Sequence, residues 1–396
     1  MQRMTVTEAS DRLGVKPATL YAYVSRGVLS RARSATGQSL FDAAEVEQVA
    51  RRGRPRRSSA GGSGGEITIE SRITSLGADR PYYRGRDALE LADSYAFEAV
   101  AEWLWTGDVD DLEEPPVWRA STAGPEAGRS AQAGLPTEVL PLERLQVIVP
   151  ALAATDPMRS NLAPDAVLDV GRALIAGMVE SLPGPSAKGG IAERLWAKLR
   201  PARRRSPLVD ALRAALVLIA DHELAASTFA ARVAASVRAD PYAVVMAGLA
   251  TMSGPLHGGA SLGAESLLAA ADGPESVRDL VGLRLRRGER IPGFGHMVYK
   301  PTDARATALL DRIRTLAPDE ANVRRADAML AEARRRRIPE PNIDFALAVL
   351  TRAAGMPIGA GEAIFAIGRT AGWLAHAREE YEHRTPLRPR AIYAGH

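Results

Sequence analysis

The sequence predicts a mainly α-helical protein with a small helix-turn-helix unit at its N-terminus. Segment 207–219 places apolar residues over most of a helix surface, with polar residues only at Asp210 and Arg213, which is typical of buried helices. Convincing alternating strands are few, and Ile67-Thr68-Ile69 is one short candidate. A Gly/Ser-rich stretch divides the chain into a short part and a long part.

Length and composition limit the classes of protein that are possible. The 396 residues allow one large domain with a small one beside it. The absence of cysteine excludes a disulfide scaffold, thiolate zinc sites, iron–sulfur clusters and a cysteine nucleophile. There is no membrane-spanning run of about 18 apolar residues and no secretion signal. We therefore expect a cytoplasmic protein.

The formal net charge of +4 is unevenly distributed. Residues 1–57 carry 11 Lys and Arg against 5 Asp and Glu, a net of +6, whereas the remainder carries 40 against 42, a net of −2. Such asymmetry suggests an appended module with an anionic partner. A solvated basic tail is the alternative interpretation.

The N-terminal unit, residues 1–51, is patterned as two short helices. Thr7 is placed to cap a helix that runs to Leu13, and Pro17 opens a second helix that Gly27 ends. Two helices joined by a three-residue turn form a helix-turn-helix. Residues 28–41, with a turn at Gly37, suit a wing.

This unit resembles the winged helix-turn-helix of MerR-type and excisionase-like DNA-binding proteins. The resemblance implies nucleic-acid contacts from Lys16, Thr19, Tyr21, Tyr23 and Arg26, some of which must instead belong to the core. A protein-interaction module built on the same geometry is the alternative.

Residues 52–66 form a basic, Gly/Ser-rich linker ahead of a body that spans residues 67–396. Gly53-Arg54-Pro55 looks like an AT-hook, in which Arg54 would enter an A·T-rich minor groove, although arginine-rich linkers often contain such segments. Within the body, residues 113–138 are rich in Pro, Gly, Ala and Ser, which predicts a surface loop.

Several enzyme classes are excluded by missing motifs. The body has no strand followed by Gly-x-Gly-x-x-Gly and no Gly-x-x-x-x-Gly-Lys-Ser/Thr, so Rossmann and P-loop enzymes are not indicated. It has no His-x-x-x-His metal motif, and the elbow-like Gly62-Ser63-Gly64 sits in the linker, where it does not indicate a Gly-x-Ser-x-Gly hydrolase. We expect neither a metal site nor a serine hydrolase.

Two of the six histidines stand in unusual surroundings. His257 and His296 both lie in glycine-flanked segments. Residues in loops with constrained backbones more often have a functional role than a role in core packing. His222, between Asp221 and Glu223, falls within a stretch that reads as helical. Any one histidine alone is more often a structural residue.

Candidate acidic and basic partners follow in the C-terminal half. Asp344 stands at a predicted helix start, where it is either a general base or, like Asn342, a plain helix cap. Arg369 and Arg388 adjoin glycine or proline. Arginine forks bind substrate carboxylates well, although a solvated surface arginine is the simpler interpretation of each one alone.

Together these motifs resemble the citrate synthase family over residues 66–396. The motifs that carry the resemblance are Tyr83-Arg84-Gly85-Arg86, Ala220-Asp221-His222-Glu223, Gly254-Pro255-Leu256-His257-Gly258-Gly259, Gly293-Phe294-Gly295-His296, Pro341-Asn342-Ile343-Asp344-Phe345 and Arg388-Pro389-Arg390. The resemblance implies a citrate synthase fold with a large and a small helical domain, and a homodimer. It also implies a transferase of the tricarboxylic acid cycle that condenses acetyl-CoA with oxaloacetate and hydrolyses the thioester to citrate and CoA.

The resemblance further implies a role for each site residue. Asp344 would take a proton from acetyl-CoA, His257 would stabilise the enolate, and His296 would polarise the ketone of oxaloacetate. Acetyl-CoA would be a co-substrate, and no cofactor or metal would be needed. The residues that would hold oxaloacetate are His222, Arg305, Phe365, Arg369 and, from the neighbouring subunit, Arg388; those that would contact CoA are Gly293, Phe294, Gly295 and Lys300.

Three residues in the motif segments depart from the family pattern. Met297 replaces the usual Arg, Ala304 replaces Pro, and Ser261 replaces Asn. The changes near His296 leave CoA affinity and acyl preference open, so 2-methylcitrate synthase acting on propionyl-CoA is one alternative. A DNA-binding regulator with a synthase-like sensor body is the other.

Overall fold

The computed structural model describes residues 3–13, 15, 17–25, 29–33, 38–43, 45–46, 69–108, 117–200, 206–300, 302–383, 385–390 and 393. Contacts divide the chain into two compact units, Met1–Thr68 and Ile69–His396, and each unit is described by itself. Lys16, Arg26 and Arg54, predicted to contact nucleic acid, lie outside the described residues. So do Ile67 and Thr68 of the candidate strand.

The first unit contains two helices and a three-stranded antiparallel sheet. Its elements are β1 (Arg3–Thr5), α1 (Val6–Leu13), α2 (Pro17–Ser25), β2 (Arg31–Arg33) and β3 (Ser39–Asp42), with strand order β1-β3-β2. A small core holds them together, formed by Ala9, Leu20, Tyr23, Leu29, Phe41 and Val46. Tyr23, a predicted nucleic-acid contact, is therefore a core residue instead. The two helices lie where the sequence predicted them.

The cap of α1 differs from the prediction. The capping residue is Thr5, not Thr7, because Thr5 Oγ1 accepts a hydrogen bond from Glu8 N at 3.3 Å and Glu8 Oε2 accepts one from Thr5 N at 2.7 Å. This reciprocal pair, three residues apart, is a capping box, and it places Thr7 inside the helix.

The second unit is built of helices beside one small antiparallel sheet of β4 (Thr74–Leu76), β5 (Pro81–Tyr83) and β6 (Arg86–Asp87). Its helices are α4 (Ala88–Ser94), α5 (Phe97–Thr106), α6 (Gly124–Ala131), α7 (Pro141–Thr155), α8 (Pro164–Ser181), α9 (Ile191–Leu199), α10 (Leu208–Leu218), α11 (Ala226–Ser236), α12 (Pro241–Met252), α13 (Gly259–Ala269), α14 (Val277–Arg286), α15 (Ala304–Leu316), α16 (Ala321–Arg335), α17 (Ile343–Ala354) and α18 (Ala360–Glu382).

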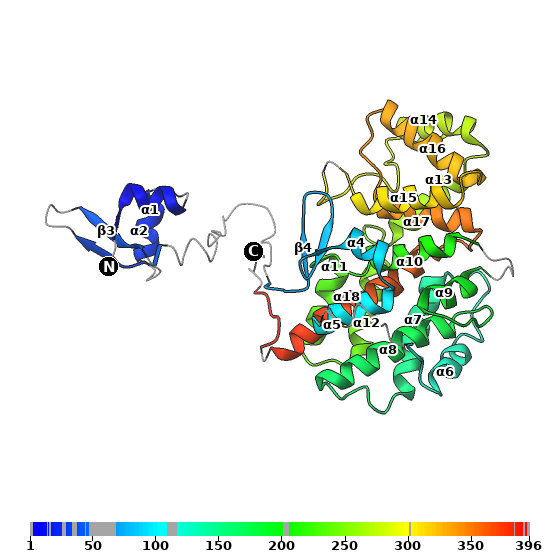
Figure 1. Ribbon diagram of the computed structural model, residues 1–396, viewed down its shortest axis with the longest axis horizontal. Helices are drawn as coiled ribbons and strands as arrows, with labels where there is room; N and C mark the ends of the chain where they lie inside the picture. Colours follow the sequence, from blue (N-terminus) through cyan, green and yellow to red (C-terminus); the bar gives the residue numbers. More distant parts are fainter. Residues whose placement is uncertain are drawn as a thin grey trace. The chain divides into compact units, whose positions relative to one another are not determined.

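These helices form a larger and a smaller group (Figure 1). Helices α13 to α17 pack against one another and gather at one end of the unit, while the remaining helices surround α18. The 23-residue α18 contacts helices of both groups, including α5, α11, α12 and α17. The predicted mainly α-helical fold with two groups of helices is confirmed.

Two local predictions in the body are wrong. The region 113–138, predicted as a surface loop, contains α6, which packs on α7 and α8. His222 lies between α10 and α11 rather than inside a helix, because the chain turns sharply there, with Glu223 at φ 51°. No helix in the described part of the chain is long and apolar enough to cross a membrane.

Candidate active site

The segment that carries His296 pairs with the chain just before α17. Phe294 and Pro341 form an antiparallel bridge, and Asn342 N donates to Gly293 O at 2.9 Å. Gly293 has φ 81°, and a Cβ there would lie 2.8 Å from Phe345 Cβ. Only glycine fits this position. The pairing holds the His296 segment against the first turn of α17, which carries Asp344.

Backbone donors define the tautomer of His296. Its Nδ1 accepts hydrogen bonds from Val298 N at 3.0 Å and Tyr299 N at 3.1 Å. Burial, with the nearby Arg305, lowers the pKa of His296 to about 4, so the ring is neutral near pH 7. Since Nδ1 is an acceptor, Nε2 carries the proton. Arg305 Nη2 also lies near Nε2, but at 3.5 Å this contact is too long to compete with the two backbone donors. His296 therefore presents one N–H donor.

Arg305 is a buried cation held by one carboxylate. Its Nε and Nη2 each lie 2.9 Å from an oxygen of Asp303, a two-point arrangement that fixes the plane of the guanidinium. Asp303 also caps α15 by accepting from Arg305 N, and it accepts from Ile343 N at 3.0 Å. Asp303 thus joins the starts of α15 and α17, and no contact in the described residues occupies Nη1 of Arg305.

His222, which follows α10 in the larger group of helices, lies close to His296 and Tyr299. Its ring centre lies 5.3 Å from those of His296 and Tyr299, and its buried Nε2 has no hydrogen-bond partner among the described residues. Burial, with Arg305 and Arg369, lowers the pKa of His222 well below its usual value. Buried polar atoms are almost always hydrogen-bonded, so the unpartnered Nε2 of the neutral His222 ring is suited to bind a polar group of a ligand.

His257 lies in the turn between α12 and α13. Its Nε2 is 2.8 Å from Oγ of the fully buried Ser227, which also accepts a hydrogen bond from Trp373 Nε1 at 3.3 Å. Because indole N–H only donates, the Ser227 hydroxyl proton is free to bond His257. Burial, with Arg369, lowers the pKa of His257 to about 4, so this ring is also neutral near pH 7.

Phe365 and Arg369 lie one turn apart on α18. The Phe365 ring lies 6.1 Å from the His257 ring in an edge-on arrangement, and the Arg369 guanidinium lies 4.7 Å from the Phe365 ring centre. Arg369 Nε donates to Ile219 O at 2.8 Å, in the turn that carries His222. These contacts place a second buried arginine on the larger-group side of the site.

Asp344 occupies the first turn of α17. The cap is Asn342, whose Oδ1 accepts hydrogen bonds from Asp344 N and Phe345 N. The Asp344 carboxyl itself does not cap the helix, and its buried Oδ1 has no partner among the described residues. Burial raises the pKa of Asp344 to about 7, although Arg305 opposes the rise.

Comparison with known proteins decides the family. Residues 62–390 match the family model described as citrate synthase, C-terminal domain. The chain belongs to the citrate synthase family. Residues 4–51 match the family model described as MerR HTH family regulatory protein.

Relatives in the citrate synthase family carry two activities in their names. Citrate synthase 2 of Bacillus subtilis (strain 168) is 30% identical, over 84% of this chain and 94% of its own length. The 2-methylcitrate synthase 1 of Corynebacterium glutamicum is 29% identical, over 79% and 88%.

A solved structure of similar fold holds two ligands. The Thermoplasma acidophilum citrate synthase, solved as a ternary complex with carboxymethyl coenzyme A and oxaloacetate, has a TM-score of 0.70 and 25% identity. The match covers 83% of this chain and 94% of that one.

Two of the four predicted CoA contacts, Gly295 and Lys300, line a cavity of about 190 Å³. Gly295, His296 and Lys300 line it together with Pro339 and Glu340. Lys300 is exposed, and its Nζ lies 3.4 Å from His296 O. Met297, directly after His296, is 91% exposed. Phe294 packs on Phe345 rather than lining the cavity.

Arg388 is not brought together with the other predicted site residues. It is exposed in the C-terminal segment, which is anchored where Leu387 N donates to Ser236 Oγ at 3.0 Å. No contact in the described residues links Arg388 to His222, Arg305 or Arg369.

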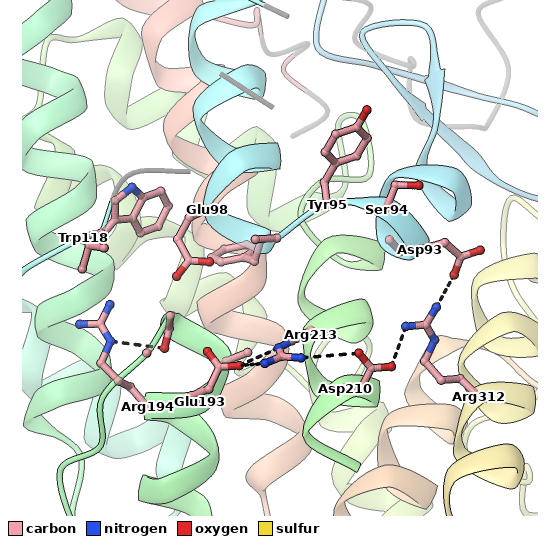
Figure 2. Close-up of a pocket in the computed structure, with 17 residues that line it drawn as sticks. Asp93, Ser94, Tyr95, Glu98, Trp118, Glu193, Arg194, Asp210, Arg213 and Arg312 are labelled. Carbon is pink, nitrogen blue, oxygen red and sulfur yellow. Dashed lines mark hydrogen bonds and ion pairs between the residues drawn. The ribbon is translucent and has the colours of Figure 1, made fainter. Parts of the chain in front are cut away.

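A cavity of about 490 Å³ elsewhere contains none of the predicted site residues (Figure 2). Its wall carries a row of alternating charges. Arg312 of α15 pairs with Asp210 of α10, at 3.0 Å, and with Asp93 of α4; Arg213 pairs with Glu193 of α9 at 2.6 Å. This row links α15 of the smaller group to helices of the larger group.

Sequence reasoning missed two groups that contact the predicted site residues His257 and Arg305. Ser227 lies in an alanine-rich helix and carries no local signal. The role of Asp303 was also missed, although it stands two residues before Arg305 in a recognisable motif. Within the described ranges, no cluster of three His, Asp or Glu side chains could hold a metal ion.

Proposed function

We propose that the body condenses an acyl-CoA with oxaloacetate and hydrolyses the resulting thioester, giving citrate and CoA when the donor is acetyl-CoA. The observation that carries the proposal is the convergence of two neutral histidines, a carboxyl of raised pKa and two buried arginines around unpartnered polar atoms. The Thermoplasma acidophilum relative, solved with a CoA analogue and oxaloacetate, supports the same assignment.

Asp344 is the proposed base. A thioester methyl is a weak acid, so its proton acceptor needs a pKa above that of an ordinary carboxylate, and efficiency is greatest when that pKa lies near the working pH. Burial raises the pKa of Asp344 to about 7. The ionised carboxylate takes a proton from the carbon next to the thioester carbonyl, and an enolate forms.

His257 is the proposed donor to the enolate oxygen. If Ser227 donates to Nε2, the proton of this neutral ring is on Nδ1. Nδ1–H then provides the fixed hydrogen bond that a developing oxyanion requires. A neutral donor suits this task because it stabilises the enolate without fully protonating it.

His296 and the arginines activate and hold oxaloacetate. His296 Nε2–H polarises the ketone, so that the enolate carbon attacks the ketone carbon and a C–C bond forms. The new alkoxide, hydrogen-bonded to His296 Nε2–H, gains one proton from solvent, and Asp344 returns to solvent the proton that it took from the acyl carbon. Arg305 and Arg369 bind the two carboxylates, and the bare Nε2 of His222 completes the contacts. Water then cleaves the thioester and releases CoA.

The assay for this function is CoA release from purified protein with oxaloacetate and either acetyl-CoA or propionyl-CoA. Release that depends on both substrates is expected, with Asp344→Asn inactive as a matched control of nearly equal size. A preference for propionyl-CoA would select the 2-methylcitrate reaction. Both donors must be assayed because one methylene changes binding by only about 1–3 kcal/mol. Absence of release with both donors contradicts the proposal.

We also propose that the body acts as a homodimer in which Arg388 completes the partner's oxaloacetate site. Arg388 is exposed and contacts none of the other site residues of its own chain among those described. An active site that lacks one predicted arginine within a chain can be completed by a symmetric partner.

DNA binding is the proposed role of the N-terminal unit. The MerR match supports it, as do the exposed Arg31 and Arg33 on one side of β2 and the 40%-exposed Tyr21 beside Arg31. Thr19 lies on the same helix as Tyr21. Duplex affinity should fall steeply with salt, and it should weaken in Arg31→Ala/Arg33→Ala. No duplex binding at low salt would leave this unit as a protein-interaction module.

A further inference from the structure

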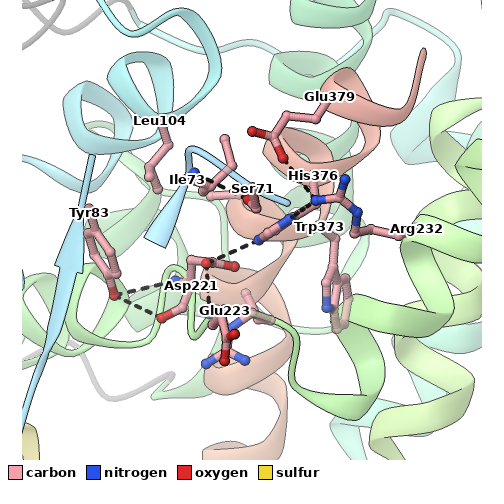
Figure 3. Close-up of polar contacts among 12 residues, drawn as sticks. Ser71, Ile73, Tyr83, Leu104, Asp221, Glu223, Arg232, Trp373, His376 and Glu379 are labelled. Atoms are coloured by element: carbon pink, nitrogen blue, oxygen red, sulfur yellow. Dashed lines mark hydrogen bonds and ion pairs between the residues drawn. The ribbon is translucent and has the colours of Figure 1, made fainter. Parts of the chain in front are cut away.

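A chain of fully buried polar side chains begins at Asp221, the residue before His222, and continues through His376 to Arg232 (Figure 3). Asp221 Oδ2 accepts a hydrogen bond from Glu223 N at 3.1 Å and lies 3.3 Å from His376 Nε2. On the other side of the ring, His376 Nδ1 lies 2.8 Å from Arg232 Nη1. The side chain of Asp221, on one side of His222, is thus tied to the backbone of Glu223 on the other side.

The direction of these hydrogen bonds follows from chemistry. A guanidinium can only donate, so His376 Nδ1 is the acceptor and Nε2 carries the proton. His376 therefore donates to Asp221. Arg232 is held in turn by Glu379 at 2.8 Å and Glu380 at 2.7 Å, which sets its orientation.

One face of α18 supports the whole arrangement. Phe365, Arg369, Gly372, His376 and Glu380 follow at spacings of three or four residues, which places them on the same side of a helix. Arg369 Nε donates to Ile219 O, and Gly372 N donates to Ala220 O at 3.0 Å. A Cβ at Gly372 would lie 2.3 Å from Asp221 Oδ1, so glycine permits this close contact.

The ring of His222 has a hydrogen bond with its own backbone, so the course of the chain at residues 221–223 affects where the ring points. Its Nε2 has no hydrogen-bond partner among the described residues, and its ring centre lies 5.3 Å from those of His296 and Tyr299. Its backbone stands beside Glu223, whose positive φ of 51° is unfavourable for a residue with a side chain. The hydrogen bond from Glu223 N to Asp221 holds that conformation.

We propose that His376, acting through Asp221, is a positioning residue that aims His222 at oxaloacetate. The inference rests on the proposed function, because it assigns His222 to that substrate. His376 does not touch the substrate, and its effect is on the binding of oxaloacetate rather than of acyl-CoA.

The test compares His376→Leu with His376→Gln, whose amide can still donate to Asp221. For His376→Leu we expect the KM for oxaloacetate to rise about ten-fold, as slight misplacement of a binding group would cause, with the KM for acyl-CoA little changed. His376→Gln should recover most of the oxaloacetate affinity. Thr370→Val, a buried polar-to-apolar change on the same helix, controls for lost stability, and melting temperatures are measured for all three.

Two further readouts separate the possible failures. If His376→Leu lowers the melting temperature but leaves the KM for oxaloacetate unchanged, the network is merely structural and the inference is wrong. If that variant does not fold, nitrogen-15 NMR of the unaltered protein decides, because an Nδ1–H tautomer at His376 would overturn the proposed chain. If the unaltered protein binds no oxaloacetate in equilibrium dialysis, the proposed function fails first, and this inference falls with it.

Discussion

At the scale of single residues, the protein rather than the substrate sets which histidine nitrogens donate. Two backbone N–H groups occupy Nδ1 of His296, and Ser227 occupies Nε2 of His257. The sequence identified both histidines because glycines surround them. It could not identify Ser227 or His376, since their importance comes from contacts between helices distant in the chain.

The raised pKa of Asp344 predicts a pH-dependent rate. Because the base must be ionised, kcat should fall as the pH drops through about 7, the pKa to which burial raises this carboxyl. The measurement is kcat with saturating substrates between pH 5.5 and 8.5, with the stability of the protein checked at each pH. A rate independent of pH over this range would contradict the assignment of Asp344 as the base.

Ser227→Ala should lower kcat about ten-fold, because His257 loses the hydrogen bond that fixes its tautomer. The KM for oxaloacetate should change little, since Ser227 faces His257 and Trp373. Steady-state kinetics with both substrates would measure this, and Ser227→Thr, which keeps the hydroxyl, is the matched control. Equal kcat for the alanine variant and the unaltered protein would remove Ser227 from the mechanism.

At the scale of elements, the sequence predicted buried helices well and tightly packed small residues poorly. Segment 207–219 contains α10, Leu208–Leu218, because its apolar surface leaves a helix few alternatives. Helix α6 was predicted as a loop because it is rich in Gly, Ala and Pro. Those small residues instead permit close packing, since a Cβ at Gly128 would lie 2.4 Å from Ser181 Oγ.

The turn around His222 was missed for a related reason. Residues 220–226 read as helical from composition, whereas the structure bends the chain there to meet α18. The β4–β6 sheet was missed because strands of two or three residues carry almost no periodic signal. Contacts between segments distant in the sequence determine both the turn around His222 and the β4–β6 sheet, so local sequence patterns do not show them.

Asp303 joins two elements, so its loss should affect both stability and binding. Asp303→Ala leaves the buried Arg305 without its partner, and such a loss costs about 3–5 kcal/mol of the free energy of unfolding. The KM for oxaloacetate should rise because Arg305 and the start of α17 both shift. Urea unfolding and steady-state kinetics measure the two effects, and Asp311→Ala, at an exposed pair on the same helix, is the control.

At the scale of the whole molecule, the proposed dimer makes a sharp prediction about mixed subunits. Asp344→Ala and Arg388→Ala should each be impaired alone. In a dimer formed from one of each, a site with Asp344 from one subunit and Arg388 from the other is intact. Random re-association of equal amounts should therefore restore activity at about a quarter of all sites.

The measurement is CoA release before and after the two variants are mixed and allowed to exchange subunits. If Arg388 serves its own subunit, no mixed dimer has an intact site, and activity will not rise on mixing. Re-association of each variant with itself gives the baseline.

The row of charges along the cavity in Figure 2 has a mechanical consequence. Arg312 lies seven residues beyond Arg305 on α15, a distance of about 10 Å along a stiff helix. Arg312 is held to the larger group by its ion pairs with Asp210 and Asp93. Arg305, nearer the start of the same helix, carries the guanidinium proposed to bind the substrate. Salt weakens exposed ion pairs first, so we expect ionic strength to change how firmly Arg312 is held and, through the helix, the position of Arg305.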